Sequence, residues 1–272
     1  MKKVLWLVTA RAGSKSIPDK NIKLLGGHPL LNYRVKCGLL TTCSSDVWIS
    51  TDSLTYAEIA KESGAFVPFL RPDVLSGDEI KSADVILHAM AHANSLHAKY
   101  EYIGLLEPTS PFILPNDLDL AVSRLDSNQN AEAIVAVRES RPHKLFIQED
   151  EMYLKNIANN LETLKRLDRQ AFKKEITPSG GFYISKWESF MRLKTFYTQK
   201  TMGYDVGQIP GIEIDEPLDW QFAEFIIEKQ SEFKYSTGEF SRLINALRLA
   251  VKVVNHKVNK EGLIDIIWGC SK

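Results

Sequence analysis

The chain has 272 residues, of which 44% are hydrophobic and 25% are charged, and its 34 basic and 34 acidic side chains cancel at pH 7. A chain of this size can bury the core of one large domain, or of one domain with a small insertion. The balanced charge argues against a nucleic-acid reader, which normally carries a basic face, so we expect no nucleic-acid partner.

Membrane and disulfide-rich classes are also disfavoured. No apolar run approaches the roughly 18 residues that cross a bilayer, and the apolar stretch before Arg11 is too short for a signal peptide. Cys37, Cys43 and Cys270 have no paired spacing that would indicate a disulfide framework or a structural zinc site. We therefore expect a cytoplasmic protein with free thiols and no membrane partner.

Predicted strands and helices alternate along most of the chain. The apolar runs of strand length are 4–8, 46–50, 66–69, 102–106, 133–137 and 180–184. Helical spacing of apolar residues predicts helices over 29–40, 54–63, 81–97, 217–228 and 239–258. Pro68 favours an edge position for the strand at 66–69. The alternation predicts an α/β fold with a doubly wound, mostly parallel sheet flanked by helices.

Two segments depart from this pattern. The sequence becomes polar and charged over 138–179, which we interpret as an insertion in a domain spanning 1–229, and as a candidate dimer arm. Residues 230–272 form a C-terminal extension whose apolar residues recur at helical spacing. We expect this extension to pack on the body of the protein or on a partner chain.

Polar clusters follow the predicted strands, at the sheet edge where α/β proteins bind their ligands. The densest is the loop 11–21, which directly follows the first strand and contains the cations Arg11, Lys15 and Lys20 among small residues. Such a loop suits a polyphosphate, although it is neither a Walker A loop nor a dinucleotide-binding fingerprint. Taken alone, a solvated basic loop explains it equally well.

The same loop resembles the RxGSKxIPxKN signature of the cytidylyltransferases that activate sialic acids and related nine-carbon acid sugars. Five further segments resemble motifs of this family in the expected order, namely 49–53, 70–72, 106–111, 180–183 and 214–219. The resemblance covers roughly residues 3–229. It implies a Rossmann-like nucleotide-diphospho-sugar transferase fold, a homodimer, and a Mg²⁺-dependent reaction of CTP with an acid sugar that gives a CMP-sugar and pyrophosphate.

Within the loop, this reaction suggests separate roles. Transfer of a nucleotidyl group concentrates negative charge on the bridging and leaving oxygens, so we expect Arg11 and Lys20 to stabilise the transition state. Ser14 and the backbone around Gly13 can donate hydrogen bonds to phosphate oxygens, and Asn21 suits the ribose or the base.

Two later residues complete the expected nucleotide site. By resemblance, Arg71 and Ser82 would meet the edge of cytosine. Each has an alternative, because an arginine before a proline is often a surface residue and a serine near a helix start is often a cap.

Three carboxylates are candidates for metal binding and proton transfer. Asp215 is the first choice as Mg²⁺ ligand, because nucleotidyl transfer uses metals held by carboxylates, phosphates and water. Asp219 is a second candidate, although at the third position of the predicted helix a carboxylate is favoured without a metal. Glu107 stands where the family usually has glutamine, so it could accept a proton from the attacking hydroxyl, bind a second metal or shift sugar preference. It could also be an ordinary glutamate at a strand end.

The acid sugar needs a partner for its carboxylate and a wall for its acyl group. We expect Arg166 to bind the carboxylate, because arginine binds carboxylates with two parallel hydrogen bonds, and Phe182 and Tyr183 to form the wall. The alternatives are the same chemistry with a legionaminic, pseudaminic or Kdo-like acid, the use of GTP, or a nucleotide-binding homologue without turnover.

Overall fold

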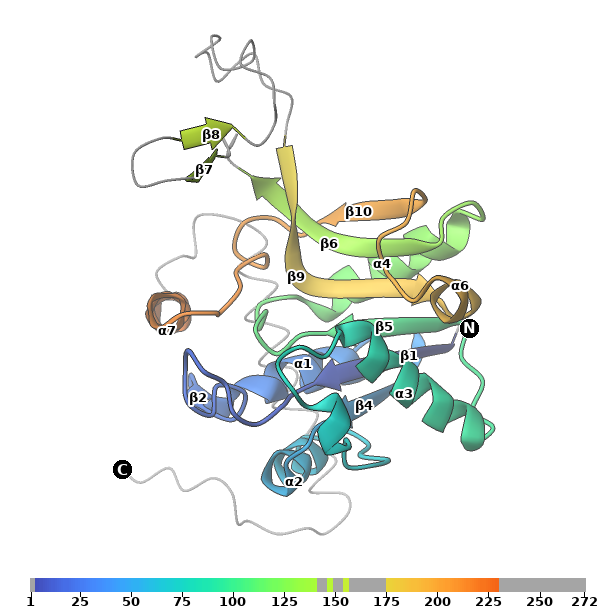
Figure 1. Cartoon of the computed structure of the whole chain (residues 1–272), viewed down its shortest axis with the longest axis horizontal. Coiled ribbons are helices and arrows are strands. Elements are labelled where there is room, and N and C mark those ends of the chain that lie inside the picture. Colours follow the sequence, from blue (N-terminus) through green and yellow to red (C-terminus); the bar gives the residue numbers. More distant parts are fainter. Residues whose placement is uncertain (1–2, 141–145, 149–153, 157–174, 230–272) are drawn as a thin grey trace.

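The computed structural model describes residues 3–140, 146–148, 154–156 and 175–229, and these form one twisted sheet with helices on both faces (Figure 1). The sheet has six strands in the order β10-β6-β9-β5-β1-β4. The strands are β1 (Lys3–Thr9), β4 (Ser44–Ser50), β5 (Tyr102–Leu106), β6 (Ala133–Ser140), β9 (Glu175–Lys186) and β10 (Thr201–Asp205). β1 runs parallel to β4 and β5, and β10 runs parallel to β6, whereas β9 is antiparallel to both of its neighbours. The predicted mostly parallel α/β sheet is confirmed.

The helices form two layers around this sheet. They are α1 (Leu30–Leu39), α2 (Leu54–Glu62), α3 (Ser82–Ser95), α4 (Pro115–Ser127), α6 (Trp187–Leu193) and α7 (Pro217–Glu228), with a short 3₁₀ helix η1 (Asp73–Leu75). One core cluster joins the sheet to α1, α2 and α4, and a second joins the opposite face to α3 and α6. No helix among the described residues is long and apolar enough to span a bilayer.

β1 lies at the centre because both of its faces are apolar. All five residues from Val4 to Val8 are fully buried. Trp6 packs in the first core cluster, whereas Leu5 and Leu7 pack in the second. A continuous apolar run is the pattern of a parallel strand covered by helices on both sides.

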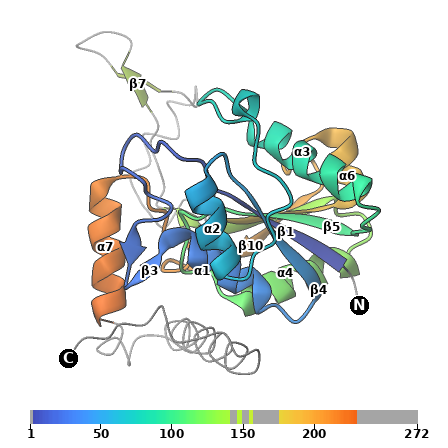
Figure 2. The same cartoon turned by 90° about the horizontal axis from the view of Figure 1, so that it is seen from below.

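Short hairpins complete the described chain. β2 (Leu24–Leu25) and β3 (His28–Pro29) form one, and β7 (Phe146–Gln148) and β8 (Leu154–Asn156) form another. α7 packs beside the β2–β3 hairpin and α1 in a third apolar cluster (Figure 2). This position brings the segment that precedes α7 next to the loop that follows β1.

The structure differs from the sequence predictions at several elements. The predicted edge strand at 66–69 is reduced to a single bridge between Phe66 and Trp48, since Pro68 has no N–H with which to continue the pairing. β6 ends at Ser140 and β9 begins at Glu175. Both ends of the segment 138–179, which we interpreted as an insertion, therefore belong to the sheet. Most of the rest of that segment lies outside the described residues, and the predicted helix over 239–258 lies wholly outside them.

Among the α-helices and the strands of the six-stranded sheet, three were not predicted, namely α4, α6 and β10. α4 carries a clear start signal, because Pro115 occupies its first position and the Asp117 carboxylate accepts a hydrogen bond from the Leu114 N–H at 3.1 Å. This helix could have been found from the sequence.

A sharp bend in β9 shapes the region near the ends of the strands. Val135 pairs with Tyr183 and Val137 with Pro178, so the four residues 179–182 lie opposite one residue of β6. Gly180 adopts a φ of +58°, a conformation that other L-residues rarely adopt. A Cβ atom on Gly180 would lie 3.2 Å from Glu107 Oε2, so the bend brings the backbone of β9 close to the residue that follows β5.

Candidate active site

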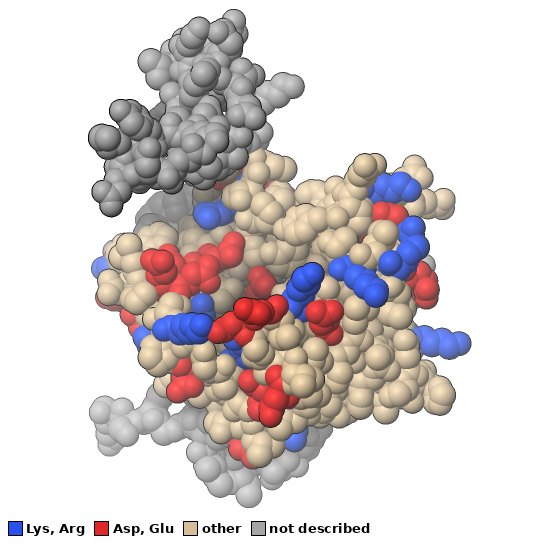
Figure 3. All heavy atoms as spheres, viewed as in Figure 1, with Lys and Arg blue, Asp and Glu red and all other residues tan. Residues whose placement is uncertain are grey.

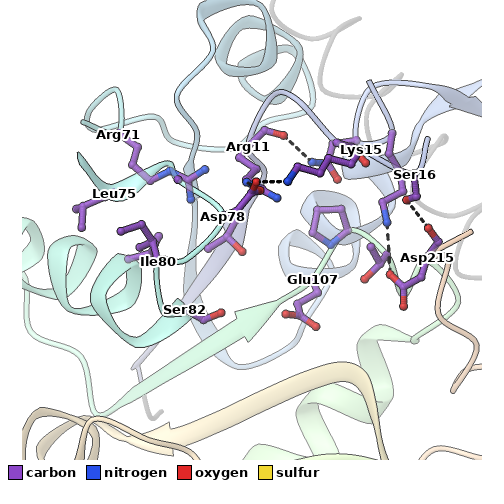
Figure 4. Close-up of a pocket in the computed structure, with 18 of the residues that line it drawn as sticks. Arg11, Lys15, Ser16, Arg71, Leu75, Asp78, Ile80, Ser82, Glu107 and Asp215 are labelled. Atoms are coloured by element: carbon purple, nitrogen blue, oxygen red, sulfur yellow. Dashed lines mark hydrogen bonds and ion pairs between the residues drawn. The ribbon is translucent and has the colours of Figure 1, made fainter. Parts of the chain in front are cut away.

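A cleft with a volume of about 530 Å³ opens at the carboxyl ends of β1 and β5 (Figure 4). Three groups of residues form most of its wall: the loop after β1, the segment between Arg71 and Val85, and the acidic residues Glu107, Glu213 and Asp215. A hydrogen bond from the Ile214 N–H to the Thr109 carbonyl, 2.8 Å long, fixes the segment before α7 against the end of β5. The predicted convergence of the polar clusters after β1 and β5 is therefore present.

The loop after β1 is held by its own backbone and by two side chains. Gly13 has a φ of +77°, so the loop turns where a side chain would be strained. The Asn21 amide donates to the Arg11 carbonyl at 3.1 Å, and the Asp52 carboxylate accepts from the Ala12 N–H at 2.8 Å. Ser14 and Asn21 line the cleft, as does Arg11.

Lys20 connects this loop to the segment before α7. Its buried ammonium group donates to the Ile214 carbonyl at 2.8 Å and to Asp215 Oδ1 at 3.4 Å. The Ser16 hydroxyl donates to the Asp215 carbonyl at 2.5 Å. The most buried cation of the loop thus lies beside the acidic end of the cleft.

The other two cations of the loop share one acidic partner. Arg11 and Lys15 both form ion pairs with the carboxylate of Asp78, and the Lys15 pair measures 2.5 Å. Hydrogen bonds from Lys15 and Arg11 hold the pKa of Asp78 below its usual value. Asp78 was not predicted from the sequence, since no motif relates it to the loop.

Arg71 is buried in the wall of the cleft that lies opposite the loop after β1. Its N–H donates to the Thr51 carbonyl at 2.7 Å, which places its side chain at the end of β4. The guanidinium lies 4.0 Å from Asp52 Oδ1, and its Nε and Nη2 atoms have no hydrogen-bond partner. Ser82 also lines the cleft and is the first residue of α3, whose N-cap is Lys81. Arg71 is therefore no ordinary surface residue, and Ser82 is no N-cap.

Three carboxyl groups gather at the other end of the cleft, from Glu107, Glu213 and Asp215. Burial, with a further contribution from the charges of Glu213 and Asp215, raises the pKa of Glu107 to about 7 against the opposing charges of Arg34 and Lys20. Burial and the charge of Asp215 likewise raise the pKa of Glu213. The fully buried Arg34 donates to the Gly181 carbonyl at 2.6 Å, so it also supports the bend of β9.

Glu213 is a site residue that sequence analysis missed. It precedes Asp215 by two residues in a segment without helix or sheet, whereas we expected the second acid at Asp219. In extended backbone, residues two apart point to the same side, so the Glu213-Ile214-Asp215 spacing was a usable signal.

Asp219 is placed outside the cleft wall. Its Oδ2 atom accepts from the N–H groups of Asp215 at 2.9 Å and Glu216 at 2.8 Å, closing a capping box at the start of α7. Asp219 therefore acts as a capping residue of α7, the alternative considered from the sequence. Asp215 and Glu213 become the better pair of candidate metal ligands.

Phe182, which we expected in the wall of the sugar site, is a correction. Phe182 is fully buried and packs on Tyr204, with 5.6 Å between ring centroids, so its ring cannot touch a bound sugar. Tyr183 points to the other face of the sheet, as alternation along a strand requires, and packs at an angle to Tyr197. Arg166 lies outside the described residues.

The donor atoms at the acidic end suit magnesium, although no group of three or more His, Cys, Asp or Glu side chains among residues 3–140 and 175–229 could hold a metal by itself. Mg²⁺ takes oxygen ligands, and is commonly held by one or two carboxylates together with substrate phosphates. Glu213 and Asp215 offer that set beside the cations of the loop.

Charged side chains of both signs are interspersed on the face shown in Figure 3, without a continuous basic surface among its described residues. This distribution agrees with the balanced composition. Nothing on that face favours a polyanionic partner as large as nucleic acid.

Comparison with known proteins gives a consistent family. A family model described as cytidylyltransferase matches residues 5–235. A CMP-N,N'-diacetyllegionaminic acid synthase of Legionella pneumophila is 27% identical over 85% of this chain and 98% of its own length. N-acylneuraminate cytidylyltransferases of Escherichia coli and Danio rerio are 28% and 30% identical, over 85% and 88% of this chain. The chain spans about half the length of these two relatives, 54% in each case.

Solved structures share the fold. A CMP:2-keto-3-deoxy-manno-octonic acid synthetase complexed with CTP superposes with a TM-score of 0.61, at 14% identity over 84% of this chain and all of that one. A 4-diphosphocytidyl-2C-methyl-D-erythritol synthase from Anaerococcus prevotii gives a TM-score of 0.54, at 14% identity over 84% and 96%. At this identity the two structures establish the nucleotidyltransferase fold alone.

Proposed function

Because this chain belongs to the cytidylyltransferase family, we propose that it transfers CMP from CTP to the anomeric hydroxyl of a 2-keto acid sugar and releases pyrophosphate. The anomeric oxygen forms the new bond to the α-phosphorus as the bond to the pyrophosphate oxygen breaks, and the hydroxyl proton passes to a base. The arrangement that supports this reaction is the cleft itself: Arg11 and Lys15 lie at one end, three carboxyl groups lie at the other, and Lys20 joins the loop to the acidic end.

The cations bind and stabilise the polyphosphate. Arg11 and Lys15 line the cleft, and their partly or mostly exposed side chains can donate to phosphate oxygens. Ser14 adds a hydroxyl donor. Lys20 is held between the Ile214 carbonyl and Asp215, next to the acidic end where the acceptor would attack. A preorganised cation at this point stabilises the charge that develops during transfer.

The buried Arg71 supports the proposed preference for cytosine. Cytosine presents two adjacent acceptors, its ring N3 and its carbonyl O2, whereas uracil presents an N–H at N3. Arg71 offers Nε and Nη2, both buried and without hydrogen-bond partners. Arginine can only donate, so these atoms match cytosine better than uracil.

The acidic end accepts the proton and holds the metal. A carboxyl group with a pKa of about 7 suits general base catalysis near neutral pH, and Glu107 has that value. Glu213 and Asp215 would hold Mg²⁺ together with the phosphates, and the ion would neutralise charge on the transferred group. Arg166 and Tyr183 stay as proposals for sugar binding.

The identity of the acid sugar has two leading candidates. An N-acylneuraminate is one, because the Escherichia coli and Danio rerio N-acylneuraminate cytidylyltransferases match 85% and 88% of this chain. An N,N'-diacetyllegionaminic acid is the other, because the Legionella relative aligns over 98% of its own length. We further propose a homodimer and a cytoplasmic location.

Pyrophosphate release tests this function. CTP, GTP, UTP and ATP are each incubated with Mg²⁺ and a panel of nonulosonic and octulosonic acids, and active pairs are repeated with EDTA. We expect release only with CTP and one acid sugar, abolished by EDTA. A CTP-dependent rise in melting temperature without turnover on any acid would favour the nucleotide-binding homologue without catalysis.

A further inference from the structure

One carboxylate occupies the two outer cations of the phosphate loop. Asp78 Oδ1 contacts Arg11 Nη1, and Asp78 Oδ2 contacts Lys15 Nζ at 2.5 Å (Figure 4). Each oxygen thus takes one cation, and the carboxylate bridges the two side chains. A phosphate group would make the same kind of bridge, because it also presents several anionic oxygens.

The bridge connects two walls of the cleft. Asp78 belongs to the segment between Arg71 and Ser82, whose side chains face the expected position of the base. Arg11 and Lys15 belong to the opposite loop, which faces the expected position of the phosphates. The ion pairs therefore cross the cleft between the expected position of the base and the expected position of the phosphates.

These contacts are weak enough to exchange with a ligand. The Asp78 side chain is 45% exposed, and those of Arg11 and Lys15 are 39% and 79% exposed. Ion pairs this close to water contribute little to stability, since both partners keep part of their hydration. A triphosphate carries more charge than one carboxylate, and so it can displace Asp78 from both cations.

We propose that Asp78 is an internal competitor for the phosphate subsite, and so a residue that determines which ligands the site selects. The proposal rests on the proposed function, because it assigns Arg11 and Lys15 to the polyphosphate. A ligand that reaches both cations replaces both ion pairs that it breaks. A ligand without phosphates has two outcomes. It either breaks the two ion pairs of Asp78 without forming new ones, or it leaves them in place and makes no contact with Arg11 and Lys15.

Calorimetry on the purified full chain tests the proposal. Binding of pyrophosphate, CTP and cytidine is measured in EDTA for the wild type, for Asp78→Asn and for Glu79→Gln. Glu79 is the matched control, because it is an exposed acid of the same segment without an ion pair within the described chain. Melting curves confirm that each variant is folded.

We expect Asp78→Asn to tighten binding of pyrophosphate and CTP by about threefold to tenfold, the scale of two exposed ion pairs, and to leave cytidine unchanged. Glu79→Gln should change each affinity by less than about twofold. Unchanged or weaker pyrophosphate binding in Asp78→Asn would overturn the proposal, as would equal tightening in both variants. If the wild type bound neither CTP nor pyrophosphate even with Mg²⁺ in place of EDTA, the proposed function would fail as well.

Discussion

The carboxyl groups of Glu107 and Glu213 meet above Gly180. A Cβ atom placed on Gly180 would lie 2.8 Å from Glu213 Oε2 and 3.2 Å from Glu107 Oε2. Burial is the main cause that raises both pKa values; the charge of Glu213 adds to it at Glu107, and the charge of Asp215 adds to it at Glu213. The arrangement opposes folding at neutral pH, and it provides both a base and oxygen ligands at the reacting end of the cleft.

The raised pKa of Glu107 predicts a pH-dependent loss of stability. Because the pKa is about 7 in the folded chain and 4.5 ordinarily, the folded state binds more protons between these values, so the free energy of unfolding falls as pH rises from about 4.5 to about 7. Glu107→Gln should remove a fall on the order of 3 kcal/mol. Denaturant unfolding in EDTA at several pH values measures it, and parallel curves for wild type and variant would contradict the assignment.

Gly180→Ala should damage both the fold and the site. Alanine at a φ of +58° is strained, and its Cβ would press on the Glu213 carboxyl group. We expect a loss of about 1–2 kcal/mol in the free energy of unfolding, together with reduced turnover.

Gly77→Ala is the matched control for stability, because a Cβ there would meet only Ile80, at an ordinary 3.7 Å. Equal destabilisation by the two substitutions would show that the geometry at Gly180 has no special role.

Asp219 and Asp215 should separate into a structural and a metal-binding residue. Asp219→Ala removes the acceptor of two N–H groups at the start of α7, so it should cost about 1 kcal/mol of stability and leave the Mg²⁺ concentration for half-maximal activity unchanged. Asp215→Asn should raise that Mg²⁺ concentration. A similar shift in both variants would return Asp219 to the metal site.

Lys20→Ala should lower kcat by about 10²–10³, as loss of one preorganised donor does. Lys23→Ala is its control, since the Lys23 ammonium group lies 4.3 Å from the centre of the Trp220 ring and does not line the cleft. Steady-state kinetics with CTP and the acid sugar distinguish the two. Retained turnover in Lys20→Ala would remove Lys20 from the mechanism.

Much of the sheet could be predicted, because its central strands are continuous apolar runs such as Val4–Val8, and the loop after β1 could be predicted from its clustered cations. Asp78 could not, since its ion pair with Arg11 joins segments far apart in the chain. Phe182 and Tyr183 could not both face a bound sugar, because neighbouring strand residues point to opposite faces of the sheet. Helices cover both faces, so the sequence does not say which of the two residues lies towards the cleft.

Phosphorus NMR of one reaction mixture tests the central claim most directly. CTP, Mg²⁺ and the active acid sugar are followed after addition of the protein. We predict that the triphosphate signals are replaced in equal amounts by a phosphodiester signal and pyrophosphate, which shows that the α-phosphorus has bonded to the sugar. A phosphomonoester signal of CMP in place of the diester from the outset, or release of inorganic phosphate with CDP, would contradict the account.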